Sequence, residues 1–398
     1  MRKTGTRLAA AAAIALLVLI WAGCGNEFRP VANPIFPPAG DPQGQHQAVS
    51  VNNAGGAIGS TTHINVSGDT VVGSHVVGQG PVHAAITPSG ARIFVVNSGD
   101  DSVSTYFTLQ ATSNPVTISL PTGSAPVFAH TTQASRMYIA NSGTGTVGVI
   151  DAGTNVLTGL VTVGNNPVAL AELPSGSKLY CVNQNAPGTV SVISTVDNLV
   201  VATIPVGNMP SFAVANDTGA FVFVANQADG TVSVINAATD TVTATLAVGT
   251  APNFLFFDNS LKRVYVTNSG SNSVSIIRTD VSPPVLLTTV SLTAGLPAGA
   301  SPGLTPVSVT ALADGSRAYV ANSGSGTVSV INTSNNTVSR TIVVGTNPVS
   351  IASSSESTKV YVANRGSNTI SVIRTTDDTV VLNIPSTSTQ PVWVLSVQ

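Results

Sequence analysis

The chain has 398 residues and a formal net charge of −2; 8% of its residues are charged and 43% are hydrophobic. The hydrophobic content excludes a disordered chain, and the weakly acidic balance argues against a nucleic-acid-binding protein, which needs clustered Lys and Arg. Uncharged polar residues therefore supply most of the surface, which is typical of an extracytoplasmic protein.

Residues 1–23 are predicted to be a targeting segment, because basic residues precede an apolar stretch too short to span a hydrocarbon core of ~30 Å. The sequence Trp21-Ala22-Gly23-Cys24 resembles a bacterial lipobox, although Trp21 stands where that pattern prefers Leu. The resemblance implies a bacterial lipoprotein with a lipid on Cys24, held at the outer membrane or at the periplasmic face of the inner membrane. An ordinary signal peptide and an uncleaved anchor are the alternatives.

Residues 24–45 are predicted to be a tether, since prolines at this density favour an extended spacer. Only Cys181 remains beyond the tether, so no disulfide can form there, and it is interpreted as a small buried residue.

Residues 46–398 carry a repeat whose most regular mark is a hydrophobic run that ends in asparagine. The asparagines are Asn97, Asn141, Asn183, Asn226, Asn268, Asn322 and Asn364, with steps of 44, 42, 43, 42, 54 and 42 residues. Each unit reads as four short strands separated by Gly, Asn and Asp turns, without helical periodicity. This organisation is typical of β-propeller blades in an all-β protein.

Eight units begin with a proline that opens the first strand of the blade: Pro81, Pro126, Pro167, Pro210, Pro252, Pro306, Pro348 and Pro391. The last unit stops after that strand, whereas the N-terminal segment supplies strand-like runs at 48–53, 61–66 and 70–77 without a first strand. We therefore expect the C-terminal strand to close an eight-bladed ring by joining the N-terminal strands. Seven blades are the alternative, with the 48–53 run peripheral.

The segment Tyr265-Val266-Thr267-Asn268 and its flanks at 231–235 and 248–252 resemble the YVTN-type β-propeller repeat family. The resemblance extends over nearly all of residues 46–398 and is specific for fold. It implies little about function, because relatives include envelope proteins and, more distantly, lactonase-like and quinoprotein propellers.

Two features break the repeat symmetry and form the candidate binding surface. Aromatic residues follow several of the strand-opening prolines by two positions, and residues 293–305 contain an insertion. The candidates are His83, Phe128, Phe212, Phe254 and Trp393 from the first feature and Leu296 and Leu304 from the second. The aromatic residues either form a platform for a peptide or glycan or simply pack between blades. The insertion either forms one wall of a site for a protein partner or is neutral.

Titratable residues give no convergent set in the sequence. Glu172 is the carboxylate expected to approach the channel, and one carboxylate does not make a divalent-metal site. His83 is interpreted as packing, with a metal shared between blades as the alternative. The sequence therefore predicts a non-enzymatic envelope module, without metal or cofactor, that binds a protein, peptide or glycan; a lactonase-like or quinoprotein-like enzyme is the alternative.

Overall fold

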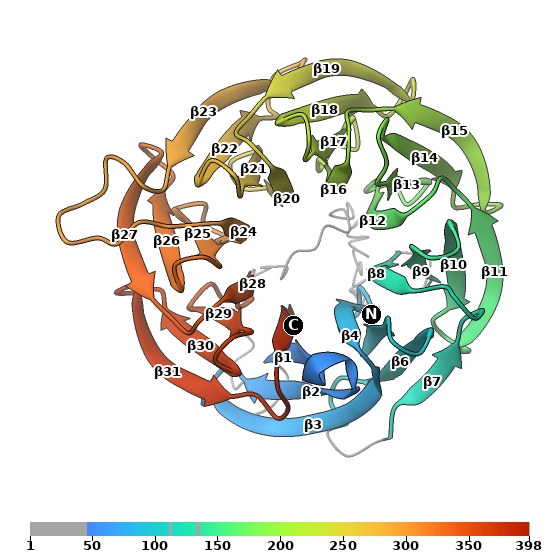
Figure 1. Ribbon diagram of the computed structural model, residues 1–398, viewed down its shortest axis with the longest axis horizontal. Helices are drawn as coiled ribbons and strands as arrows, with labels where there is room; N and C mark the ends of the chain where they lie inside the picture. The colour runs from blue at the N-terminus through green and yellow to red at the C-terminus, as the bar shows by residue number, and fades with distance from the viewer. Residues whose placement is uncertain (1–45, 111–113, 133–135, 398) are drawn as a thin grey trace, which may run out of the picture.

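The computed structural model describes residues 46–110, 114–132 and 136–397, which form eight four-stranded antiparallel sheets arranged as blades around a central axis (Figure 1). The predicted targeting segment, Cys24 and the tether lie outside the described residues. No helix in the described part of the chain is long and apolar enough to cross a membrane.

Each blade has an innermost, a second, a third and an outer strand. The innermost strands are β4 (Pro81–Ile86), β8 (Pro126–Thr131), β12 (Pro167–Glu172), β16 (Pro210–Ala215), β20 (Pro252–Asp258), β24 (Pro306–Ala311), β28 (Pro348–Ser353) and β32 (Pro391–Val397). The second strands are β5 (Arg92–Asn97), β9 (Arg136–Asn141), β13 (Lys178–Asn183), β17 (Phe221–Asn226), β21 (Arg263–Asn268), β25 (Arg317–Asn322), β29 (Lys359–Asn364) and β1 (Gln47–Asn52).

The third strands are β6 (Ser102–Phe107), β10 (Thr146–Asp151), β14 (Thr189–Ser194), β18 (Thr231–Asn236), β22 (Ser273–Arg278), β26 (Thr327–Asn332), β30 (Thr369–Arg374) and β2 (Ile58–Asn65). The outer strands are β7 (Val116–Ser119), β11 (Val156–Thr162), β15 (Leu199–Pro205), β19 (Thr241–Ala247), β23 (Val285–Ser291), β27 (Thr337–Val343), β31 (Thr379–Pro385) and β3 (Thr70–Gln79). One short 3-10 helix, η1 (Ala54–Gly56), links β1 to β2. Blades 1 to 7 follow in chain order from β4, and blade 8 combines β1, β2 and β3 with β32.

Blade 8 closes the ring. The C-terminal strand β32 pairs antiparallel with β1, with Val397 opposite Gln47 and Trp393 opposite Val51. The expected eight-bladed closure is therefore confirmed, and the seven-blade alternative is wrong because β1 is a full member of a sheet. Closure removes the open blade edge that would otherwise invite intermolecular strand pairing.

The repeated asparagine is a buried hydrogen-bond centre. In blade 5, Nδ2 of Asn268 donates to Oγ of Ser273 at 3.1 Å and to Oγ of Ser275 at 3.0 Å. A Cβ on Gly249, which precedes β20, would lie 2.7 Å from Asn268 Cγ. The glycine of the Val-Gly segment is therefore required by close packing on this asparagine. In blade 8, Thr387 lies against the equivalent Asn52 instead, and its hydroxyl is 2.8 Å from that of Thr62.

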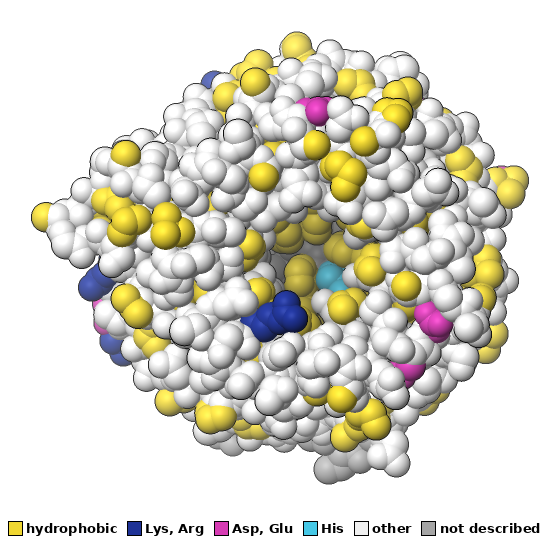
Figure 2. Space-filling model, viewed as in Figure 1, with side chains coloured by type: hydrophobic (Ala, Val, Ile, Leu, Met, Phe, Trp, Pro, Cys, Tyr) yellow, Lys and Arg dark blue, Asp and Glu magenta, His cyan; other side chains and the backbone are white. Residues whose placement is uncertain are grey.

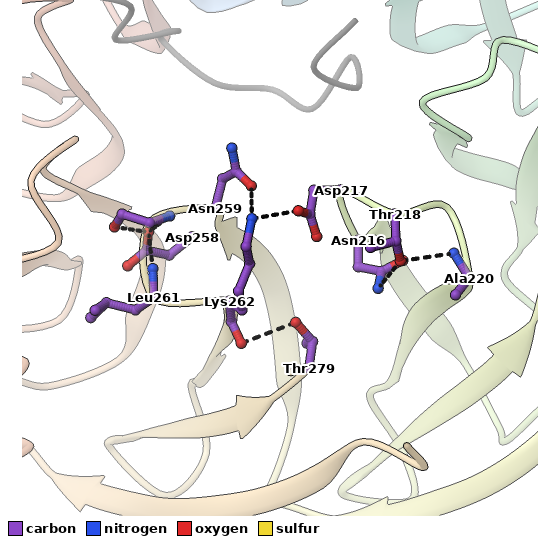
Figure 3. A network of polar contacts seen from close by, with 10 residues as sticks. Asn216, Asp217, Thr218, Ala220, Asp258, Asn259, Leu261, Lys262 and Thr279 are labelled. Carbon is purple, nitrogen blue, oxygen red and sulfur yellow. Dashed lines mark hydrogen bonds and ion pairs between the residues drawn. The ribbon is translucent and has the colours of Figure 1, made fainter. Parts of the chain in front are cut away.

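Neighbouring blades are also joined by polar contacts between their turns. Figure 3 shows Lys262, in the turn before β21, reaching across to Asp217 in the turn of blade 4 and to Oδ1 of Asn259 at 2.6 Å. Farther out, Oδ1 of Asp240 in blade 4 accepts from the Tyr180 hydroxyl of blade 3 at 2.7 Å. Turn carboxylates such as Asp240 therefore hold adjacent blades together in addition to shaping their own turns.

Candidate functional site

The innermost strands place one residue from each blade at the same height of the channel wall, two positions after the strand-opening proline. These residues are His83, Phe128, Ala169, Phe212, Phe254, Ser308, Ser350 and Trp393. Ring centroids of His83 lie 4.2 Å from Phe128 and 4.4 Å from Trp393. Phe212 lies 5.7 Å from Phe128 and 4.5 Å from Phe254. The five rings form one continuous row, the aromatic arc.

The aromatic arc covers one side of the channel only. Ala169 contributes no ring, yet the arc stays continuous because this small side chain lets Phe128 and Phe212 meet across blade 3. Ser308 and Ser350 occupy the same position in blades 6 and 7. Figure 2 shows the central hollow bordered by hydrophobic side chains, with a histidine inside it and a basic group at its edge. The expected convergence of these aromatic residues is therefore found, and it makes a one-sided apolar wall.

The other two candidate residues lie elsewhere. The loop between β23 and β24 extends outward from the ring, away from the central opening (Figure 1). Leu296 packs partly buried against the core between blades 5 and 6, while Leu304 is 40% exposed. The structure therefore separates the insertion from the aromatic arc.

A buried histidine–glutamate pair lies farther along two of the same innermost strands. His130, near the end of β8, and Glu172, the last residue of β12, face each other across the interface of blades 2 and 3. Nε2 of His130 is 3.6 Å from Oε2 of Glu172, and the two side chains are 4% and 1% exposed. At the equivalent place between blades 6 and 7 the hydroxyls of Thr310 and Ser353 meet at 3.3 Å. Burying an ionisable pair is costly, so its presence at one interface of a repeat makes this pair a candidate functional group.

His83 is linked to this pair electrostatically and to the next blade by a hydrogen bond. Its Nδ1 accepts from the backbone N–H of Ala129 at 3.3 Å. Burial, and then the nearby His130, lower the pKa of His83 to about 3. The imidazole of His83 is therefore neutral at physiological pH.

The sequence alone did not single out His130. Glu172 and His83 were candidates, but Glu172 stands 42 positions beyond His130, and only the fold brings these two side chains together. A signal was present: the positions equivalent to His130 in the neighbouring units hold Ala85 and Ala171, and those equivalent to Glu172 hold Thr131 and Ala215. A histidine and a glutamate in consecutive units, each in place of an uncharged residue near the end of an innermost strand, indicate an inter-blade pair.

Other reactive groups contribute little. Among the described residues no group of three or more His, Cys, Asp or Glu side chains could hold a metal ion. Cys181 is fully buried, and burial raises the pKa of its thiol above the usual range. The chemistry that the channel offers is therefore acid–base and hydrogen-bonding chemistry beside an apolar wall.

The model of the family described as "Lactonase, 7-bladed beta-propeller" matches residues 237–395. That segment runs from the outer strand of blade 4 to the closing strand, so His83, His130 and Glu172 lie outside it. No curated protein matches the chain.

The chain is a β-propeller that is similar to lactonases over its C-terminal part. Among solved structures, the dihydro-heme d1 dehydrogenase NirN in complex with DHE has a TM-score of 0.70 at 12% identity, covering 90% of this chain and 77% of that chain. The periplasmic gluconolactonase PpgL of Pseudomonas aeruginosa has a TM-score of 0.62 at 17% identity, covering 89% and 99%. Virginiamycin B lyase of Staphylococcus aureus has 0.56 at 14% identity, covering 71% and 91%. These likenesses show the fold alone, since the neighbours carry different activities.

The expectation of a non-enzymatic envelope-binding module is contradicted. The match of residues 237–395 to the lactonase family favours the lactonase-like alternative. The expectation failed because it required catalytic groups that could be recognised along the sequence. In a propeller, groups from different blades meet at the channel wall.

Proposed function

We propose that this protein is a lactonase-like hydrolase that opens a cyclic ester in its central channel. The single observation that carries the proposal is the buried pair of His130 and Glu172 between the innermost strands of blades 2 and 3, whose Nε2 and Oε2 atoms lie 3.6 Å apart. A histidine next to a buried carboxylate is a suitable general base for activating water. The lactonase family match supports the choice of a cyclic ester as the substrate class.

The aromatic arc supplies the binding surface for such a ring. A lactone has an apolar face of C–H groups, which stacks favourably on aromatic side chains. Its carbonyl and hydroxyl groups need polar partners, and histidine and serine side chains share the arc's level of the channel. A concave apolar wall with a few polar groups is the usual form of a small-molecule site.

The reaction is written as a hydrolysis without a covalent enzyme intermediate. Water attacks the carbonyl carbon while the imidazole of His130 takes one of its protons, and the Glu172 carboxylate stabilises the imidazolium that forms. The ring C–O bond then breaks, and the ring oxygen leaves as an alkoxide that takes the proton back from His130. The product is an open-chain hydroxy acid, whose carboxyl group loses a proton to solvent.

The test is hydrolysis of a panel of five- and six-membered lactones, followed by proton release at constant pH. His130→Gln and Glu172→Gln keep the size of each side chain and remove the base or its charge. We expect each to lower kcat/KM at least about 100-fold, the usual contribution of a general base. Thr310→Val is the matched control at the equivalent interface and is expected to leave activity unchanged. Lack of turnover by the native protein, or full activity of both Gln variants, would refute the proposal.

We also propose that the chain belongs to the YVTN-type repeat proteins and is anchored to the bacterial envelope by a lipid on Cys24. The support is the asparagine-ended repeat, which the fold uses as a buried hydrogen-bond centre, and the lipobox-like segment. Metabolic labelling with a palmitate analogue tests the anchor: label in the native protein and none in Cys24→Ala is expected. Equal labelling of both would contradict it.

A further inference from the structure

The closing seam, the interface between blades 8 and 1, lacks a contact that every other interface of the ring has. Each of the other interfaces is crossed by a Lys or Arg side chain that reaches a carboxylate, amide or backbone oxygen of the adjacent blade. In order around the ring these side chains are Arg92, Arg136, Lys178, Lys262, Arg263, Arg317 and Lys359. Among the described residues, no Lys or Arg side chain bonds from blade 8 to blade 1. The buried side-chain bonds of the closing seam join β2 to Tyr106 of β6 instead.

Two residues that depart from the repeat meet in the closing seam. His63 of β2 lies where blades 2 to 7 have valine or isoleucine, and Tyr106 of β6 lies where they have isoleucine. Nε2 of His63 is 3.1 Å from the Tyr106 hydroxyl, which donates to Oγ1 of Thr61 at 2.9 Å. Nδ1 of His63 is 2.7 Å from Oε1 of Gln47. The ring of His75 lies 3.9 Å from that of Tyr106 and completes this cluster.

The cluster buries a base with no carboxylate bonded to it. His63 is 1% exposed. The polar groups that face it are Gln47 of β1, Thr61 of β2, His75 of β3 and Tyr106 of β6. Burial, and then the nearby His75, lower the pKa of His63 from 6.5 to about 3. A proton on His63 is therefore unfavourable while the seam is closed and becomes favourable once water reaches the ring.

The closing seam also passes through the aromatic arc. The ring centroids of Trp393 in β32 and His83 in β4 lie 4.4 Å apart across it. Much of the rest of the seam is filled by apolar side chains of both blades, such as Val51 of β1 and Ala84 of β4. Separation of the two blades would therefore interrupt the channel wall within the arc.

We propose that the closing seam is an acid-operated gate, in which protonation of His63 releases blade 8 from blade 1 and opens the channel wall between Trp393 and His83. The other interfaces stay closed, because the Lys and Arg side chains that cross them, and the aspartates that some of them meet, remain charged down to about pH 5. The chain runs from β3 to β4 through Gly80, so blade 8 stays attached to blade 1 when the seam opens. The gate does not depend on the proposed lactonase activity.

Acid favours the open seam because the open form binds a proton that the closed form excludes. Between the ordinary pKa of 6.5 and the lowered value of about 3, the equilibrium constant for opening rises about tenfold for each unit by which pH falls. Above pH 6.5 the opening of the seam takes up no proton at His63, so this contribution disappears.

The test measures how fast a thiol in the closing seam is labelled. Ala84→Cys, in a Cys24→Ala background, places a thiol among the buried apolar side chains of the seam. Cys181, fully buried in blade 3, is the control thiol of the same molecule. The reagent is 4,4′-dithiodipyridine, which reacts with thiols in acid, and peptide mass spectrometry separates the two labelled sites. We expect the labelling rate of the introduced thiol, relative to that of Cys181, to rise at least about 30-fold between pH 7.5 and pH 5.

A constant ratio of the two rates would overturn the proposal. If both thiols are labelled faster in acid by the same factor, the ring unfolds as a whole. If neither is, the seam stays closed.

Two variants separate His63 from the rest of the seam. His63→Gln keeps a polar side chain that does not titrate, so it should reduce the rise at least about tenfold. Gln47→Glu places a carboxylate against Nδ1 of His63 and favours the charged imidazole in the closed seam, so it should reduce the rise as well. Thermal midpoints at pH 7.5 show whether each variant folds. The full 30-fold rise in either folded variant would overturn the role of His63.

Discussion

The interface between blades 2 and 3 and the interface between blades 6 and 7 use the same strand positions for different purposes. The first buries His130 against Glu172, and the second buries Thr310 against Ser353. The neutral pair satisfies its hydroxyls at little cost, whereas an ionisable pair requires desolvation that packing alone does not repay. The comparison indicates that residues conforming to the repeat stabilise the fold. Positions where one blade departs from the repeat are the places to look for reactive side chains.

The largest expected effect comes from making the first interface resemble the second. The double variant His130→Thr with Glu172→Ser should lose at least about 1,000-fold in lactone kcat/KM, since it removes the base and its partner together. The free energy of unfolding of this variant should change far less than its activity, because removing the desolvation cost of the buried pair is offset by the cavity that the smaller Thr and Ser side chains leave. Kinetics and denaturant unfolding measure the two effects. A stability loss with retained activity would reverse the interpretation of both interfaces.

Acid should weaken the side of the ring that holds the buried histidines. Burial, and then the nearby histidine, lower the pKa of both His63 and His83 from 6.5 to about 3. Between these values the unfolded chain binds protons that the folded chain does not, so stability falls as pH falls. Each histidine contributes a slope of about 1.4 kcal/mol per pH unit between pH 6.5 and pH 3.

The measurement is the free energy of unfolding between pH 7 and pH 4.5. His83→Phe should reduce the slope by the contribution of one histidine, and Thr310→Val should leave it unchanged. Equal slopes in native protein and His83→Phe would show that His83 is protonated in the fold.

Blades 5 and 8 offer a second comparison, between a glycine and a threonine that face the repeated asparagine. A Cβ on Gly249 would lie 2.3 Å from Oγ of Ser271 and 2.7 Å from Asn268 Cγ. Gly249→Ala is therefore expected to cost about 2–3 kcal/mol through overpacking. Thr387→Ala, which only removes hydroxyl contacts, should cost about 1 kcal/mol. Denaturant unfolding of both variants measures the difference, and equal costs would contradict the packing argument.

The smallest expected effect concerns the residue before the strand-opening proline. This residue has positive φ in every blade, 53° at Thr305 in blade 6 and 51° at Asn347 in blade 7. A β-branched side chain is strained in this region, whereas asparagine tolerates it. Thr305→Asn should therefore stabilise by about 1 kcal/mol. A lower thermal midpoint in this variant would show that the Thr305 side chain contributes more than its strain costs.

Much of the fold could be predicted because every unit carries the same local sequence signals for its strands and turns. The prolines that open the innermost strands, the asparagine that ends each second strand and the glycine packed on it are local features. The closure between β1 and β32 could also be predicted, because the missing strand of the first unit stands at the other end of the chain. The aromatic arc was predicted as a set of positions, although its continuity depends on the small side chain of Ala169 and its one-sided form on Ser308 and Ser350.

The acid–base pair could not be predicted with the same reliability, because the two side chains come from different blades and meet only when the interface forms. The insertion at 293–305 could be seen in the sequence, while its outward direction depends on the packing of Leu296 against blades 5 and 6.

By itself, the sequence determined an eight-bladed propeller, since strand period, turn residues and repeat length are properties of short segments. The tertiary structure alone decided which titratable groups meet. The distance between His130 and Glu172 and the hydrogen bond from the N–H of Ala129 to His83 are set by the contact of neighbouring blades.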